Sequence, residues 1–333
     1  MGTHNRWSLV RRGFAPGIVL FMNLPVTPRL DSRSIRQQFG RRATRINQAD
    51  FLLREVEQRM FDRLDLIKLQ PARLIDLGSG RGQGVRVLAQ RFPQALCLAL
   101  DFALPMLNRP SGDARLMSGL TDRLTNRLPA PLRRSLASWA TDATGLRICA
   151  DVQRLPLAGA SVDLLWSNLC WHWLAEPMAA LQDWYRVIRP EGLLMFSSFG
   201  VDTGKELREL GWPVPIFPDM HDIGDALSQN GFAEPVMDAE RLTLEYRDAG
   251  KLMSELSALG GNSATDRAPG LHTRADLKRW RSVLENAMKA RAGVFQVSIE
   301  VIYGHAWCAV RKKLPAGLAP VNWVSQIKPK STS

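Results

Sequence analysis

The chain contains 333 residues with a formal net charge of +12 at pH 7, and 45% of its residues are hydrophobic. This length and apolar content are typical of one large or two modest globular domains, and they exclude a disordered or low-complexity chain. The positive charge favours an acidic partner, such as nucleic acid, an anionic membrane or an acidic protein. The arginines are scattered, so a basic solvated surface is an equally open interpretation.

Residues 1–30 are predicted to form a disordered or extended tail, in which Met22 is an alternative start. Residues 31–312 would form a single folded domain, followed by a flexible tail over 313–333. The domain opens with one or two helices before the core. Their apolar residues recur at helical spacing: Phe51, Leu52, Val56, Met60, Leu64 and Ile67.

Short apolar runs then alternate with helical patterns. The runs that predict strands are "RLIDL", "ALCLALD", "LRICAD", "VDLLWSNL" and "GLLMFSSF", with helical patterns at "VRVLAQRF" and "MAALQDWYRVI". This alternation predicts an α/β fold with a parallel sheet between helices. Residues 109–145 interrupt the rhythm and are predicted to be a helical insertion. The last third predicts the helices "KLMSELSALGG" and "RADLKRWRSVLENAMKA" and a final strand, "VSIEVIYGHAWCAV".

The cysteines indicate a reducing compartment. Cys97, Cys149, Cys170 and Cys308 lie far apart and form no C-x-x-C pair. Cys97, Cys149 and Cys308 lie in apolar strand-like runs, which predicts buried thiols in a cytoplasmic protein. The sequence has no metal-site spacing, and no apolar run approaches the ~20 residues of a membrane span.

A glycine-rich loop follows the first strand. Gly78, Gly80 and Gly82 give D-x-G-x-G-x-G with Asp76. The loop does not match the dinucleotide-binding fingerprint G-x-G-x-x-G, because Gln83 stands where the last glycine should be. It does not match the Walker A motif either, because G-K-[ST] is absent. The loop therefore predicts close backbone approach to a ligand without a pyrophosphate.

Acidic residues end three successive predicted strands. Ligands of open α/β sheets bind at the carboxyl ends of strands, where all three acids are predicted to lie. Asp76 is placed to meet an ammonium group and Asp101 to bind ribose hydroxyls. Asp151 is placed to accept a hydrogen bond from an adenine amino group. Phe102 and Val152 are predicted to sandwich the adenine. An Asp at a strand end is often only a helix cap, but three of them beside this loop favour S-adenosylmethionine.

Longer motifs carry a family resemblance. "LIDLGSGRG", "ICADVQRLPLAGASVDLLWSNLCWHW" and "YRVIRPEGLLMFSSFG" resemble successive motifs of class I methyltransferases. "IRQQFGRRA", "FSSFGVDTGKELREL", "LSALGGNSATDRAPGLHTRADL" and "VIYGHAW" resemble the malonyl-[acyl-carrier protein] O-methyltransferases of biotin synthesis. The resemblance runs from about Ser34 to Trp307. It implies a Rossmann-like fold with a mainly parallel seven-stranded sheet, an N-terminal helical lid and an inserted helical cap over 109–145.

The resemblance also implies an activity: methyl transfer from S-adenosylmethionine to the malonyl carboxylate on an acyl carrier protein or coenzyme A, during pimeloyl synthesis. A carboxylate is already ionised at pH 7, so no catalytic base is predicted. The carrier would be an acidic partner, steered by basic residues of the insertion such as Arg133 and Arg134. Neither nucleic acid nor a membrane span is expected, and the oligomeric state is left open.

Several residues are candidates for holding the acceptor. Arg42 and Arg208 are candidate anchors for the malonyl carboxylate, with a solvated arginine as the alternative. Trp171 and His172 follow the fourth strand near the expected methyl position, where either could orient a substrate or simply pack. Asn168 is predicted to touch the methionine part of the cofactor.

One departure from the family pattern keeps other functions open. The family helix usually reads F-x-R-A-A-x-x-Y, and Ile46 stands at the tyrosine position in "FGRRATRI". Ile46 has no group to bond a carboxylate. The chain also resembles assembly factors of respiratory complex I, in which this fold modifies or chaperones a protein. A nucleic-acid methyltransferase is disfavoured by "SNLC" in place of an N-P-P-Y-type signature, and a non-enzymatic binding module by the intact cofactor loop.

Overall fold

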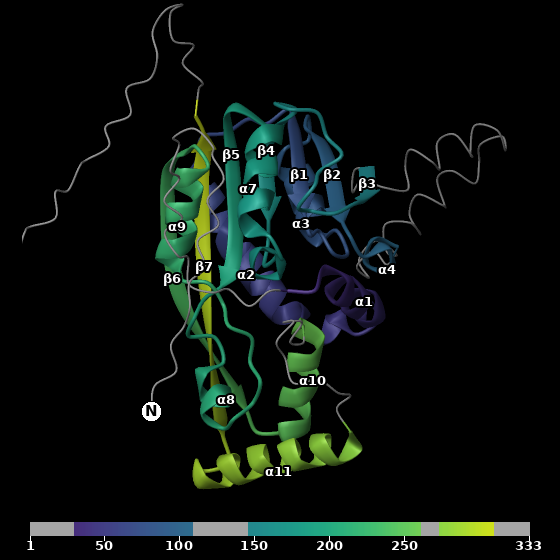
Figure 1. Ribbon diagram of the computed structural model, residues 1–333, viewed down its shortest axis with the longest axis vertical. Helices are drawn as coiled ribbons and strands as arrows, with labels where there is room; N and C mark the ends of the chain where they lie inside the picture. The colour runs from purple at the N-terminus through teal and green to yellow at the C-terminus, as the bar shows by residue number, and fades with distance from the viewer. Residues whose placement is uncertain (1–29, 109–145, 261–272, 310–333) are drawn as a thin grey trace, which may run out of the picture.

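The computed structural model describes residues 30–108, 146–260 and 273–309 (Figure 1). The expected insertion over 109–145, with Arg133 and Arg134, lies outside the described residues. So do residues 1–29 of the expected N-terminal tail and all of the expected tail over 313–333.

A seven-stranded sheet forms the centre of the fold, in the order β3-β2-β1-β4-β5-β7-β6. Its strands are β1 (Arg73–Leu77), β2 (Leu96–Asp101), β3 (Leu146–Cys149), β4 (Val162–Ser167), β5 (Ile188–Phe199), β6 (Phe232–Tyr246) and β7 (Phe295–Cys308). The first five are parallel, while β7 runs antiparallel to both β5 and β6. The predicted Rossmann-like, mainly parallel sheet is confirmed.

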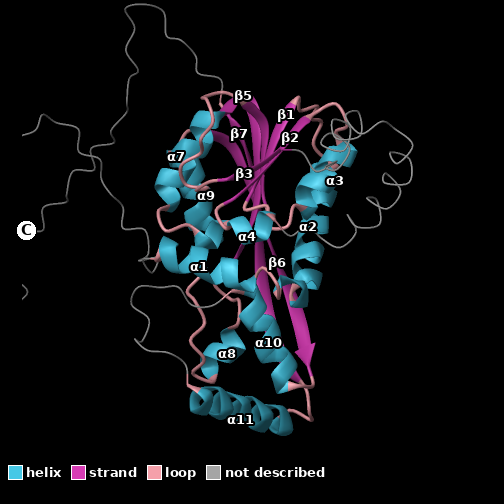
Figure 2. Cartoon of the chain, turned by 90° about the vertical axis from the view of Figure 1, so that its right-hand side faces the viewer, coloured by secondary structure: helices cyan, strands magenta, loops and turns pink. Residues whose placement is uncertain are grey.

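Helices cover both faces of the sheet (Figure 2). The helices are α1 (Ser32–Arg42), α2 (Asp50–Leu64), α3 (Gln83–Arg91), α4 (Leu104–Leu107), α7 (Pro177–Val187), α8 (Lys205–Glu209), α9 (Met220–Gln229), α10 (Ala249–Leu259) and α11 (Arg274–Ala290). Because alternate strand residues point to opposite faces, Leu74 and Leu164 join the core beneath α2 and α3. Ile75 and Leu165 join the core beneath α7 and α9.

Helix α2 is fixed to the sheet by packing and by charge. Its Phe61 ring stacks on Trp166 with the ring centroids 4.6 Å apart. Arg59 pairs with Glu240 of β6 at 2.6 Å, and Arg63 contacts the same carboxylate at 3.1 Å. The Arg63 guanidinium also lies 3.9 Å from the centroid of the Tyr303 ring. These contacts fix α2 in place, and the first two turns of α2 face the glycine-rich loop after β1.

The antiparallel pair β6 and β7 extends past the parallel strands, and α8, α10 and α11 pack around its far end (Figure 1). Helix α1, capped by Asp31 through the N–H groups of Arg33 and Ser34, lies on the same side as the carboxyl ends of β1 and β2. The N-terminal helices and this lower group therefore enclose the strand ends where a ligand is expected.

The thiol predictions are confirmed except for Cys149. Cys97 and Cys308 are buried, whereas Cys149 is exposed, so its predicted burial is wrong. The reason is topological: β3 is an edge strand, and an edge strand has one neighbour fewer to cover it. No helix in the described ranges has the length and apolar character needed to cross a bilayer.

The packing of α2 generates a stability prediction. Phe61→Ala removes a ring that is only 6% exposed and leaves a cavity against Trp166, which should cost about 3–5 kcal/mol. The midpoint of urea unfolding is expected to fall clearly. Leu66→Ala, at a side chain 85% exposed, is the matched control and should leave the midpoint unchanged. Equal midpoints for the two variants would contradict this account of α2.

Candidate active site

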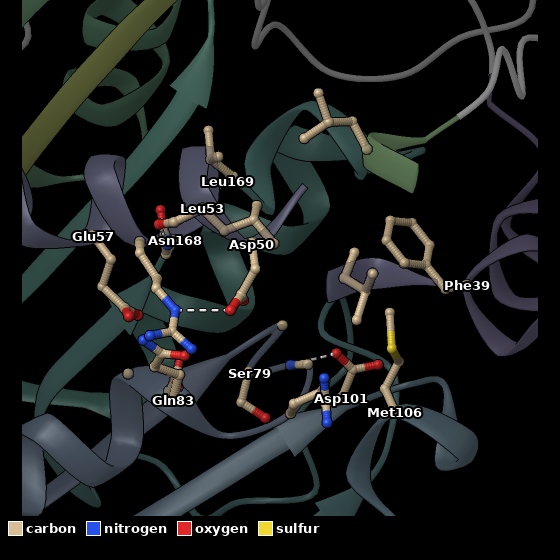
Figure 3. Close-up of a pocket in the computed structure, with 18 of the residues that line it drawn as sticks. Phe39, Asp50, Leu53, Glu57, Ser79, Gln83, Asp101, Met106, Asn168 and Leu169 are labelled. Carbon is tan, nitrogen blue, oxygen red and sulfur yellow. Dashed lines mark hydrogen bonds and ion pairs between the residues drawn. The ribbon is translucent and has the colours of Figure 1, made fainter. Parts of the chain in front are cut away.

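A pocket lies at the carboxyl ends of the central strands, between the glycine loop and the N-terminal helices (Figure 3). Its floor is the loop after β1, and Asp101 after β2 lines one side. Glu57 of α2 and Asn168 after β4 line it from the other elements. In Figure 3, Glu57 and Gln83 lie toward one end, and Asp101 and Met106 toward the other.

The glycine loop has the backbone that its sequence predicted. Gly78, Gly80 and Gly82 have φ of 69°, 53° and 74°, a left-handed conformation that costs little only for glycine. A Cβ at Gly78 would also lie 2.7 Å from the Cys170 Sγ atom. The loop therefore brings bare backbone to the pocket surface, as a closely held ligand requires.

Asp101 fixes the middle of this loop. Its carboxylate accepts hydrogen bonds from the N–H groups of Gly80 at 2.9 Å and Ala103 at 2.8 Å. The residue is only 6% exposed, and burial raises the pKa of Asp101 to about 6 despite these bonds. An ionised carboxylate has further lone pairs, so Asp101 remains able to accept from ribose hydroxyls.

Asp76 and Glu57 meet at the first turn of α3. Asp76 accepts from the Val85 N–H at 3.0 Å, and burial raises the pKa of Asp76 to about 7, with a smaller contribution from Asp101. A Cβ on Gly84 would lie 3.1 Å from Oδ2 of Asp76 and 2.4 Å from Oε1 of Glu57. Burial and the neighbouring Asp76 charge raise the pKa of Glu57 to about 8.

The predicted adenine contacts lie outside the lining of this pocket. Asp151 is exposed, and its carboxylate accepts from the Gln153 N–H at 2.9 Å as a local turn. Val152 is buried in the core beneath α7, while Phe102 packs toward Phe39, with ring centroids 6.1 Å apart. Asp151 does lie near the other two aspartates, because the charges of all three help to raise the pKa of Cys170. Its adenine contact stays a prediction.

Asn168 lines the pocket as expected, but its amide is already engaged. Its Nδ2 atom donates to the Leu53 carbonyl at 3.1 Å, and its Oδ1 atom accepts from the Ser197 hydroxyl at 2.8 Å. The side chain therefore ties the end of β4 to helix α2, and a bound cofactor would meet a preorganised wall here.

The Trp171–Trp173 turn places Trp171 in the hydrophobic core and His172 and Trp173 in the lining of the pocket. Trp171 is buried, with its ring stacked 5.2 Å from Phe196, so it supports the sheet rather than the pocket. His172 lines the pocket, and its Nδ1 accepts from the Phe199 N–H at 3.3 Å. Burial lowers the pKa of His172 to about 3, which keeps the ring neutral at physiological pH.

A second, larger cavity of about 1030 Å³ adjoins the first. The side chains of Trp173, Phe199 and Leu259 line both cavities. The larger cavity extends between α1, α8, α10 and α11, with an apolar wall that includes Trp212 and Phe217. A ligand in each cavity would therefore lie next to these three side chains, which is the arrangement that transfer of a group between two bound molecules requires.

The two candidate arginines have different surroundings. Arg42 lines the larger cavity, and its Nη1 atom is buried with no hydrogen-bond partner in the described part of the chain. Burial lowers the pKa of Arg42 from its usual value. Arg208 lines neither cavity, because its guanidinium donates to the Val201 carbonyl. Arg42 is therefore the better placed anchor for an anionic acceptor.

Sequence reasoning missed Glu57 and the boundary residues Phe199 and Leu259, whereas Trp173 was expected beside the methyl position. Glu57 had a detectable signal, because it interrupts the buried face of α2 between Leu53 and Phe61, where an acid is rarely placed without a role. Ile46, which departs from the family pattern, is 7% exposed and lines the smaller pocket. Within residues 30–108, 146–260 and 273–309, no group of three or more potential metal ligands converges.

The loop geometry generates a binding prediction. Gly78→Ala should weaken binding of S-adenosylhomocysteine at least tenfold, measured by calorimetry, because the new Cβ meets the Cys170 sulfur 2.7 Å away. Gly293→Ala carries the same left-handed strain, with φ of 84°, but meets no atom within 4 Å, and should bind normally. Adding Cys170→Ala to Gly78→Ala should restore part of the affinity. Full affinity in Gly78→Ala alone would contradict this reading of the loop.

Comparison with known proteins agrees with this geometry. The family described as "Methyltransferase domain" matches residues 75–196. A malonyl-[acyl-carrier protein] O-methyltransferase of Gallionella capsiferriformans is 42% identical over 290 residues, covering 84% of this chain and 91% of the relative. The protein of that name from Laribacter hongkongensis is 41% identical over 297 residues, covering 86% of this chain and 94% of the relative.

A solved structure from Bacillus halodurans C-125, assigned as a methyltransferase, matches with a TM-score of 0.50 at 11% identity, covering 76% of this chain and 99% of that chain. This likeness shows the fold. The matching family model and the sequence relatives identify an enzyme that transfers methyl groups from S-adenosylmethionine. The chain belongs to the malonyl-[acyl-carrier protein] O-methyltransferase family.

Proposed function

We propose that the chain transfers a methyl group from S-adenosylmethionine to the free carboxylate of a malonyl thioester, carried by an acyl carrier protein or by coenzyme A, in pimeloyl synthesis. The observation that carries this proposal is the pair of adjoining cavities with a common wall of Trp173, Phe199 and Leu259. The smaller cavity suits the cofactor, and the larger one suits an acceptor that enters from another side.

The residues of the smaller pocket fit the cofactor chemically. When bound, S-adenosylmethionine supplies an electrophilic methyl carbon on a positively charged sulfur. Asp101 is placed to accept from ribose hydroxyls, and the bare backbone at Gly78 and Gly80 allows close approach. Glu57 lies toward the other end (Figure 3). Oδ2 of Asp76 approaches Gly84 together with Oε1 of Glu57, so an ammonium group there would find carboxylate oxygens.

The larger cavity fits an acceptor with an uncharged body and an anionic end. Its volume of about 1030 Å³ exceeds the space that a malonyl group alone would need, which leaves room for part of the pantetheine arm. Arg42 supplies a guanidinium at the cavity wall whose Nη1 has no acceptor in the described structure. A carboxylate is the natural partner of such a group.

The reaction needs positioning rather than proton removal. The malonyl carboxylate is ionised at pH 7, so its oxygen bonds to the methyl carbon as the carbon–sulfur bond breaks, and no proton moves. The neutral His172 lies among Trp173, Phe199 and Phe217, and this aromatic group excludes water from the attacking oxygen. Alignment and desolvation of the nucleophile are the contributions that the chain makes.

Basic side chains near the larger cavity favour an acidic carrier. Lys278 and Arg281 of α11 and Arg41 of α1 line it and are exposed at the surface. Opposite charge on the carrier would speed encounter with this face. Arg133 and Arg134 remain candidates for the same role outside the described residues. A cytoplasmic location, expected from the separate cysteines, is part of this proposal.

The alternative acceptors receive less support. The relatives reported above carry the malonyl-[acyl-carrier protein] name, so they give no support to a complex I assembly factor that modifies or chaperones a protein. The substitution at Ile46 places an apolar side chain in the smaller pocket, whereas the larger cavity keeps the cationic Arg42 as an anchor for an anionic acceptor. Ile46 is therefore compatible with a carboxylate acceptor.

The direct test follows methyl transfer by mass spectrometry. The wild-type chain should convert malonyl carrier protein or malonyl-coenzyme A to its methyl ester, and it should restore growth of a biotin auxotroph that lacks this step. Arg42→Gln should raise the KM for malonyl thioester at least tenfold, because a charged hydrogen bond is lost. Arg45→Gln, at an exposed residue that lines neither cavity, should keep the wild-type KM. A folded wild type that methylates neither thioester would refute the proposed substrate.

Carrier docking is tested with charge reversal. Lys278→Glu combined with Arg281→Glu should raise the KM for malonyl carrier protein, and wild-type KM should rise with added salt. The KM for malonyl-pantetheine, which lacks the acidic carrier, should rise less than the KM for malonyl carrier protein. Lys289→Glu, on the same helix but outside the cavity lining, is the control. An unchanged KM for the carrier substrate in the double variant would eliminate this face as the docking site.

A further inference from the structure

Glu57 is a buried acid to which the family resemblance assigned no role. It lies on α2, is 8% exposed, and lines the cofactor-side pocket. A Cβ on Gly84 would come within 2.4 Å of its Oε1 and 3.1 Å of Asp76 Oδ2. The two carboxyl groups thus converge on the same point beside the first turn of α3.

The Glu57 carboxyl group lacks a protein partner. Across the described ranges, no hydrogen bond reaches it and no cationic nitrogen lies within 4.0 Å of it. The nearby cations are committed elsewhere: Arg54 pairs with Asp50 at 2.7 Å, and Arg86 donates to the Gly82 carbonyl at 3.4 Å. A buried acid without a donor is costly unless a ligand supplies one.

Burial, together with the neighbouring carboxylates, keeps a proton on the pair. Glu57 faces Asp76 from β1 and, on its own helix, Asp50 and Arg54, with Arg86 of α3 beyond. Asp76 in turn faces Asp101 from β2. Burial raises the pKa of Glu57 to about 8 and that of Asp76 to about 7. Near pH 7, the empty pair therefore retains about one proton.

The position of the pair selects the part of the cofactor that it would meet. Asp101, placed to bind the ribose, lies toward the opposite end of the pocket from Glu57 (Figure 3). A ligand with its ribose at Asp101 extends its amino-acid part toward Glu57. The donor in that part is an ammonium group, with a positive charge and three N–H bonds.

We propose that Glu57 joins Asp76 in binding the methionine ammonium of S-adenosylmethionine, and that the cofactor enters in exchange for a proton carried by one of the two carboxyl groups. The O–H bond of one carboxyl group breaks, its proton passes to solvent, and the ammonium N–H groups take its place. No oxidation or further reactant is involved. This inference rests on the proposed cofactor pocket and does not depend on the identity of the methyl acceptor. A result that refutes the malonyl substrate would therefore leave the role of Glu57 intact, and the reverse also holds.

Calorimetry in buffers of different ionisation enthalpy tests the exchange in the wild-type chain. Binding of S-adenosylhomocysteine, which keeps the ammonium, should release about one proton at pH 7 and should weaken at least tenfold per pH unit below it. Both carboxyl groups are protonated at low pH and must lose protons to bind the ammonium group. The affinity for S-adenosylhomocysteine is therefore expected to rise as the pH increases toward the pKa values of the pair. 5′-Methylthioadenosine, which lacks the amino-acid part, should release no proton. Equal proton release by the two ligands would overturn the proposal.

Variants separate Glu57 from its surroundings. At pH 8, Glu57→Gln should weaken S-adenosylhomocysteine binding about tenfold and reduce its proton release, while 5′-methylthioadenosine binds as before. Retained binding of that second ligand shows that the pocket is folded. Glu55→Gln, on the same helix with a side chain 52% exposed, should match wild type in both measurements. Wild-type affinity and proton release in Glu57→Gln would refute a role for Glu57.

Discussion

The site depends on how two strand-end carboxylates hold a glycine loop. Asp101 accepts from the Gly80 N–H, and Asp76 accepts from the Val85 N–H at the start of α3. These two bonds hold the segment from Gly80 to Val85, and the N–H groups of Gly78 and Ser79 also donate to the Leu100 carbonyl. Both acids are buried, and the start of α3 offers a partial positive charge that offsets part of that cost. The loop can then present its backbone to a ligand without a phosphate group.

The second constraint is the wall between the cavities. Trp173, Phe199 and Leu259 come from η2 (Trp171–Trp173), β5 and α10, so three separate elements must assemble before the boundary exists. These side chains line both cavities, so a ligand in either cavity would contact them. This arrangement suits a reaction in which the nucleophile is already charged and in which the enzyme gains most by removing its hydration.

The sheet was predictable from sequence because alternating strands and helices leave few topologies open. Asp76, Asp101 and the loop glycines were found for the same reason, since the two acids lie at the ends of strands and the glycines follow the first strand directly. The surroundings of the other site and core residues depended on long-range packing, which the sequence pattern does not show. Trp171 and Trp173 are two positions apart, yet the tight turn of η2 sends one into the core and the other to the cavity wall. Cys149 lay in an apolar run, but edge position rather than composition set its exposure.

The central claim is that donor and acceptor occupy the two cavities and meet at their common wall. The most direct measurement is a crystal structure with S-adenosylhomocysteine and a malonyl thioester bound together. This account predicts the sulfur beside Trp173 and Phe199, the ammonium between Glu57 and Asp76, and the malonyl carboxylate on the Arg42 side of the wall. A carboxylate held away from that wall, or an adenosyl group in the larger cavity, would contradict it.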